Sequence, residues 1–198
     1  RSRPVDEIRA EAERLAQAGF TELVLTGIHL TSYGRDFTPR QTLLDAIRAV
    51  QDVPGVRRIR LGSLEPTVAT VEFAQALRTM DKVCPQFHLA LQSGSDTVLQ
   101  RMARRYNMRM YRQAMENLRA VYPMAAFTTD VLTGFPGETE AEFEETRAFI
   151  REARYAKIHV FPYSQREGTK AAVMPGQLSN TEKERRARLL IAVGDEMA

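Results

Sequence analysis

The sequence predicts an α/β domain built as a partial parallel (βα) barrel, related in shape to a TIM barrel. Short apolar runs alternate strictly with amphipathic stretches along the chain. Successive runs lie roughly 30 to 40 residues apart, a spacing typical of parallel strands joined by helices. No glycine-rich dinucleotide loop follows the first run. The pattern therefore favours the barrel and leaves an open doubly wound sheet as the alternative.

The first elements are a helix, a strand and a second helix. In residues 5–15 apolar side chains recur at helical spacing, with Pro4 in the first turn and Gly19 beyond the end. The nearly all-apolar run 23–26 is typical of a strand covered on both faces. Residues 43–50 carry the next helical face, which a Val-Pro-Gly sequence closes.

The remaining elements follow in the same order. Further strands are predicted at residues 56–64, 87–92, 126–133 and 157–163. Further helices are predicted at residues 73–80, 98–102, 111–121, 139–153 and from 182 to the end. Thr139 and Glu142 form a capping box at the start of their helix. We expect the basic side chains of the last helix to form its solvated side: Lys183, Arg185, Arg186 and Arg188.

Composition limits the classes of protein to consider. The chain has 198 residues, enough for one well-buried domain. Its net charge of +3 is mild, so it permits contact with nucleic acid without arguing for it. No apolar run approaches the ~20 residues of a membrane helix. The single cysteine, Cys84, excludes internal disulfides and favours a reducing, cytoplasmic setting.

Candidate functional residues lie where the predicted strands end, since a parallel barrel carries its chemistry there. These ends are rich in glycine, small hydroxyls and single carboxylates: residues 26–29, 62–66, 92–96, 133–138 and 162–164. They hold no Ser–His–Asp set, HExxH motif or Walker loop, which disfavours a hydrolase. Gly134 and Gly137 let the backbone approach a planar ligand closely, although a plain strand-to-helix turn is the alternative interpretation.

Several stretches resemble one enzyme family. The run TTDVLTGFPGET at residues 128–139 closely resembles the fifth-strand motif of radical S-adenosylmethionine (SAM) enzymes. Further matches resemble the methylthiotransferase branch: residues 1–4, 92–95, 102–106 and 163–172. Within that branch, three segments look most like the enzymes acting on threonylcarbamoyl-adenosine of tRNA: residues 25–30, 61–66 and 87–92.

The resemblance implies a SAM-dependent transferase that modifies tRNA. Family members have an N-terminal cluster domain, a radical SAM barrel and a C-terminal RNA-binding domain; residues 1–198 would form the single barrel domain, truncated at both ends, with strands two to six and without the first. A CxxxCxxC loop holds the 4Fe–4S cluster in the family and would precede Arg1. Cys84 lies outside such a spacing. We therefore expect no metal ligand and no catalytic residue in this chain, and an inactive fragment of an active enzyme.

The resemblance also assigns a cofactor site for SAM. Thr26 and Gly27 would receive the methionine amino group, and Gln92 and Ser93 would lie near the ribose. Arg105 would pair with the methionine carboxylate. The wall beside the adenine would comprise Gly134, Phe135, Gly137, Phe161 and Tyr163. Glu65 would meet either the cofactor or the modified nucleoside.

Other interpretations stay open beside this one. Two other substrates are possible for an enzyme of this family: isopentenyl-adenosine of tRNA and an aspartate of a ribosomal protein. An alternative of a different class is a non-catalytic barrel that binds nucleoside or RNA. His29 is a candidate for substrate contact, whereas His88 and His159 fit packing roles better. A barrel without its first strand would expose strand edges, so we expect such an edge to pair with another copy of the chain, a crystal neighbour or a disordered tail.

Overall fold

The computed structural model describes residues 1–197, and the chain divides into two compact units. Unit 1 consists of Arg1–His88 and Gln113–Ala125. Unit 2 consists of Leu89–Arg112 and the residues from Ala126 onwards.

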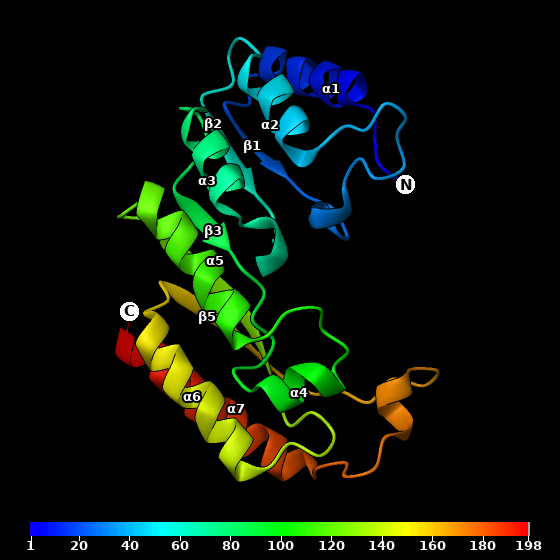
Figure 1. The fold of residues 1–198 in the computed structure, drawn as a ribbon, viewed down its shortest axis with the longest axis vertical. Helices are drawn as coiled ribbons and strands as arrows, with labels where there is room; N and C mark the ends of the chain where they lie inside the picture. Colours follow the sequence, from blue (N-terminus) through cyan, green and yellow to red (C-terminus); the bar gives the residue numbers. More distant parts are fainter. Residues whose placement is uncertain (198) are drawn as a thin grey trace. The chain divides into compact units, whose positions relative to one another are not determined.

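Unit 1 places helices beside a short parallel sheet. Its elements are α1 (Val5–Gln17), β1 (Glu22–Leu25), the 3-10 turn η1 (Leu30–Ser32), α2 (Leu43–Gln51), β2 (Arg58–Leu61), the 3-10 turn η2 (Pro66–Val68), α3 (Val71–Arg78) and β3 (Gln86–His88). β1 pairs with β2 in parallel, and Leu25 lies opposite Leu61. Helices α1 and α2 lie side by side (Figure 1). A capping box of Thr42 and Asp45 starts α2, because both side chains bond the exposed amides of its first turn.

Unit 2 is built around the longest strand of the chain. Its elements are α4 (Asp96–Arg101), β4 (Ala126–Thr133), α6 (Glu140–Ala153), β5 (Lys157–Pro162), the 3-10 turn η3 (Lys170–Val173) and α7 (Asn180–Met197). The helix α5 (Met108–Val121) begins in unit 2 and ends in unit 1. β4 and β5 pair in parallel, and α6 and α7 lie side by side (Figure 1).

The observed elements confirm the predicted α/β class, in which strands and helices alternate and paired strands run parallel. The strand β4 and the capping box of Thr139 and Glu142 have the predicted residues. The strand predicted at 87–92 is wrong in its bounds, because the regular strand ends at His88. Beyond it, Leu91 N–H donates to the Thr129 hydroxyl and Gln92 turns to a φ of 64°, which breaks the strand. The last helix begins before residue 182, and position 198 lies outside the described residues.

Candidate functional site

In unit 1 the register of the sheet brings two polar side chains together. His29 and Glu65 each lie four positions beyond the registered pair Leu25 and Leu61. Because β1 and β2 are parallel, the segments that follow them leave the sheet at the same end. The His29 Nε2 atom lies 3.3 Å from Glu65 Oε1. The sequence singled out both residues but did not predict that they pair.

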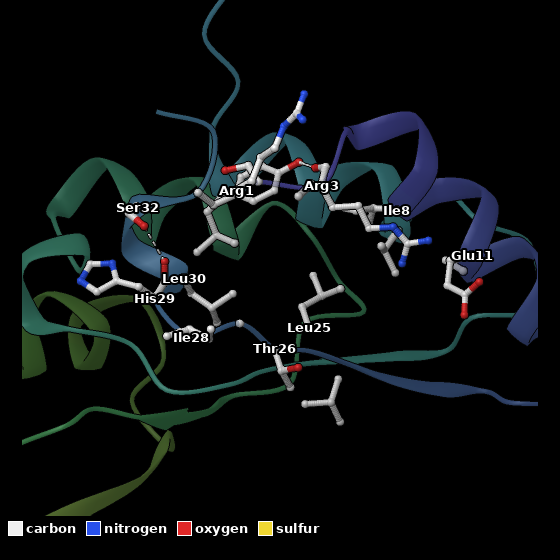
Figure 2. A pocket seen from close by; sticks show the side chains of 18 of the residues that line it. Arg1, Arg3, Ile8, Glu11, Leu25, Thr26, Ile28, His29, Leu30 and Ser32 are labelled. Carbon is white, nitrogen blue, oxygen red and sulfur yellow. Dashed lines mark hydrogen bonds between the residues drawn. The ribbon is translucent and has the colours of Figure 1, made fainter. Parts of the chain in front are cut away.

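A pocket of about 870 Å³ follows β1 in unit 1. Its walls are mostly apolar side chains of α1, β1 and α2, and Thr26, Gly27 and His29 line the end where β1 finishes. Figure 2 shows Arg1 and Arg3 across the pocket from Thr26. A volume of several hundred Å³ is the range of small-molecule sites. Two of the residues predicted to hold a cofactor therefore line a hollow of suitable size.

The outer edge of β1 runs along this pocket. β1 pairs with β2 on one side, and within residues 1–197 no strand pairs with its other side. An unpaired parallel edge presents free backbone donors and acceptors. Self-association through this edge stays a prediction.

In unit 2 the 92–93 segment lies beside the strand β4, which pairs with β5. Gln92 N–H donates to the Asp130 carbonyl, and the Gln92 carbonyl accepts from Leu132 N–H. Tyr163 N–H donates to the Thr133 carbonyl. The 92–93 segment and the two strand termini therefore lie beside one another. Whether this edge and the Thr26–Gly27 edge face one ligand stays a prediction.

Ser93 is fully buried, and its hydroxyl is used inside the protein. It lies 3.3 Å from the Thr146 hydroxyl of α6 and accepts a hydrogen bond from Ser95 N–H. The neighbouring Gly94 approaches α6 so closely that a Cβ atom there would lie 2.6 Å from the Thr146 Cα. These contacts lock the 93–95 loop onto α6, so a ligand would meet the backbone of this loop and not the Ser93 side chain.

A buried ion pair secures the turn after β4. Gly134, at a φ of 70°, donates its N–H to Glu138 Oε2 at 2.7 Å. Arg186 of α7 donates to the same oxygen at 2.7 Å and to the Glu138 carbonyl at 2.9 Å. Burial raises the pKa of the Glu138 carboxyl, and the hydrogen bonds from Arg186 and Gly134 counter that rise. The glycine-rich turn is thus held in shape from within the protein.

This ion pair corrects the prediction for the last helix. Lys183 and Arg186 are buried, not solvated, whereas Arg188 is exposed as expected. The physical reason is helical spacing: Lys183 and Arg186 continue the stripe of Leu190 and Val193, which α7 turns towards the rest of unit 2. The helical spacing of this stripe could have been recognised in the sequence. The prediction instead assigned these side chains to the solvated side because they are charged.

Aromatic side chains occupy the ends of β4 and β5. Phe135 and Tyr163 are buried and meet edge to face, with ring centroids 5.6 Å apart. The Lys183 ammonium lies 5.1 Å from the centre of the Tyr163 ring. The Tyr163 hydroxyl is buried and has no hydrogen-bond partner among the described residues. A bound polar ligand would supply the partner that this hydroxyl lacks.

The remaining predicted residues differ in exposure. Phe161 on β5 is half exposed, and Arg105 is exposed between α4 and α5. The structure gives Arg105 no ion-pair partner within residues 1–197, so its charge is available to an anionic group. Gly137 donates its N–H to the Gly176 carbonyl, which ties the turn to the segment before α7.

Glu142 connects three parts of unit 2. It caps α6 through Thr139 and forms an ion pair of 2.7 Å with Arg101 of α4, while Thr97 donates to its other oxygen. Partial burial alone would raise the pKa of Glu142, but these donors outweigh it and hold that pKa at about 2. The carboxylate is therefore ionised throughout the physiological range and fixes α4 against α6.

The chain does not fit an iron–sulfur cluster by itself. Cys84, its single cysteine, is buried, and residues 1–197 contain no group of three His, Cys, Asp or Glu side chains placed to hold a metal ion. None of the helices in this range is long and apolar enough to cross a membrane.

Comparisons with known proteins agree on one family. Residues 1–150 match the family described as the Radical SAM superfamily. The chain is 42% identical over its whole length to threonylcarbamoyladenosine tRNA methylthiotransferase MtaB of Bacillus subtilis strain 168, of which it covers 44%. It is 40% identical to tRNA-2-methylthio-N(6)-dimethylallyladenosine synthase of Symbiobacterium thermophilum, again over its whole length and 43% of that protein.

Solved structures show the same fold. The coproporphyrinogen III oxidase HemN from Escherichia coli, a radical SAM enzyme, superposes with a TM-score of 0.72 at 16% identity, over 98% of this chain and 45% of that one. Methylornithine synthase PylB gives a TM-score of 0.63 at 17% identity, over 96% of this chain and 53% of that one. The chain thus spans less than half the length of the two sequence relatives.

Proposed function

Since this chain belongs to the radical SAM superfamily, we propose that it is the SAM-binding domain of a tRNA methylthiotransferase. The observation that carries the proposal is identity of 40% or more, over the whole chain, to two relatives named for methylthio modification of tRNA adenosines. The full-length protein is the enzyme and acts on tRNA in the cytoplasm. The cluster ligands lie outside this chain, so residues 1–198 alone are inactive.

Taken by itself, each unit carries groups of the kind that bind SAM, which supplies the family's radical and methyl chemistry when bound. In unit 1 the carbonyls of Thr26 and Gly27 accept from the methionine amino group. In unit 2 Arg105 pairs with the methionine carboxylate, because it is an exposed cation with no ion-pair partner within residues 1–197. The backbone of 92–93 binds near the ribose, and the turn from Gly134 to Gly137 with Phe161 and Tyr163 flanks the adenine.

Threonylcarbamoyl-adenosine is the substrate we favour. The Bacillus relative, 42% identical, is named for that nucleoside. Dimethylallyl-adenosine is the second candidate, because the Symbiobacterium relative at 40% identity is named for it. The difference in identity is small, so the choice rests on residues at the site.

Modification of tRNA tests the proposed activity directly. Deletion of the gene should remove the methylthio group from one tRNA nucleoside, read by mass spectrometry of digested tRNA, and the gene should restore it. The mass of the lost nucleoside identifies the substrate. An unchanged set of methylthio nucleosides would contradict the proposal.

Cofactor binding tests the assigned residues. Arg105→Gln in the full-length protein should weaken SAM binding about tenfold in a calorimetric titration, as expected for the loss of a charge-assisted contact. Arg188→Gln is the matched control, since that arginine is also exposed. Equal affinity of both variants would remove Arg105 from the site.

A further inference from the structure

The pair formed by His29 and Glu65 has no evident structural duty. Its members are partly exposed, with 46% of the His29 side chain and 26% of the Glu65 side chain accessible. Such pairs contribute little to stability. Glu65 precedes η2, yet its side chain caps nothing there. The turn is held instead by Glu65 N–H, which donates to the Thr31 hydroxyl at 3.3 Å.

The contact between the two side chains fixes their orientation. The contact joins His29 Nε2 to Glu65 Oε1, and the structure gives neither His29 Nδ1 nor Glu65 Oε2 a partner within residues 1–197. The pair thus offers two polar atoms from two adjacent strand ends. In Figure 2 the imidazole of His29 projects away from Leu25 and Thr26, which lie lower in the pocket. Ile28, which directly precedes His29, is fully exposed and adds an apolar surface.

We infer that this pair recognises the polar group on N6 of the substrate adenosine, which rests on the proposed function. A threonylcarbamoyl group carries a urea N–H and a hydroxyl, which can donate to Glu65 Oε2 and to an unprotonated His29 Nδ1. A dimethylallyl group has no polar atom and would leave His29 Nδ1 and Glu65 Oε2 without a hydrogen-bond partner in the complex. A site built to bond a substrate's polar groups rejects an analogue that lacks them. Glu65 is then a specificity residue that contacts the nucleoside and not the cofactor.

The test uses the full-length reconstituted protein and three anticodon stem-loop RNAs. They are identical except for threonylcarbamoyl-adenosine, dimethylallyl-adenosine or plain adenosine at the target position. Two variants, Glu65→Gln and His29→Leu, are compared with wild type by kcat/KM for methylthio formation. RNA affinity without SAM, by fluorescence anisotropy, gives a readout independent of radical chemistry. Glu13→Gln is the matched control, since Glu13 forms a similarly exposed ion pair with Arg9 on α1.

Both variants should lose about tenfold or more in kcat/KM and in affinity on the threonylcarbamoyl RNA, and stay within about twofold on the other two. The control should match wild type on all three. Unchanged preference in the variants, or an equal loss on every RNA, would overturn the inference while leaving the proposed function intact. Failure of the proposed function looks different: wild-type protein would then modify none of the three RNAs.

Discussion

The two units treat the polar residues at their strand ends in opposite ways. In unit 2 the side chains of Ser93 and Glu138 bond to the protein itself: Ser93 to Thr146, and Glu138 to Arg186 and Gly134. In unit 1, Thr26, Gly27 and His29 line an open pocket, and the His29–Glu65 contact is partly exposed.

This difference in bonding suits the strand ends of the two units to different roles. In unit 2 buried side-chain contacts hold the backbone of the strand-end loops in one conformation, which is the surface that a ligand would contact. Unit 1 leaves side chains free to contact a ligand, at little cost to its own stability. Substitutions at equivalent strand ends should therefore affect stability strongly in unit 2 and weakly in unit 1.

The largest effect is expected from Arg186→Met in unit 2. The variant leaves the buried Glu138 carboxyl without its cation, which should lower the free energy of unfolding by about 3–5 kcal/mol. Urea unfolding measures the change. The control is Arg188→Met on the exposed side of α7. Equal stability of the two variants would show that the ion pair does not hold the turn.

Two glycines that follow strands give a direct comparison of the units. Gly94→Ala should cost about 2–3 kcal/mol, because the new Cβ would lie 2.6 Å from backbone of α6. Gly27→Ala in unit 1 should cost less than about 1 kcal/mol, because its Cβ would meet a flexible Leu30 side chain at 3.2 Å. Thermal unfolding of both variants checks the order, and the reverse order would refute the proposed contrast.

Glu142→Gln should give a smaller and pH-dependent effect in unit 2. The folded protein holds the pKa of Glu142 at about 2, below its ordinary value of 4.5, so ionisation favours the folded state. At neutral pH the variant should lose about 1–2 kcal/mol. The difference from wild type should shrink as the pH falls from 4.5 towards 2. Urea titrations at several pH values measure it, and a difference independent of pH would contradict the assigned charge.

The smallest effect on stability is expected from Glu65→Gln in unit 1. Its pair with His29 is partly exposed, so the change should stay within about 0.5 kcal/mol. Thermal unfolding measures it, with wild type as the reference. A loss above 1 kcal/mol would mean that Glu65 supports the fold, and would undermine its assignment to substrate recognition.

The sequence by itself determined the α/β class, the strand β4 and the capping box of α6, because apolar periodicity and capping are properties of neighbouring residues. It also placed the polar and glycine-rich turns at the strand ends. The sequence could not predict where β3 ends. There the Leu91 N–H donates to the hydroxyl of Thr129, a residue far away in the sequence, and this interrupts the regular strand pairing.

Only the tertiary structure decided which of these polar groups are free. Whether Ser93 or Arg186 meets solvent depends on the segment packed against it, and the bonded residue lies about fifty positions away in both cases. The pairing of His29 with Glu65 likewise depends on the parallel register of two strands. Local sequence fixes the kind of residue at each turn, whereas long-range packing fixes whether its polar atoms bond to the protein or to a ligand.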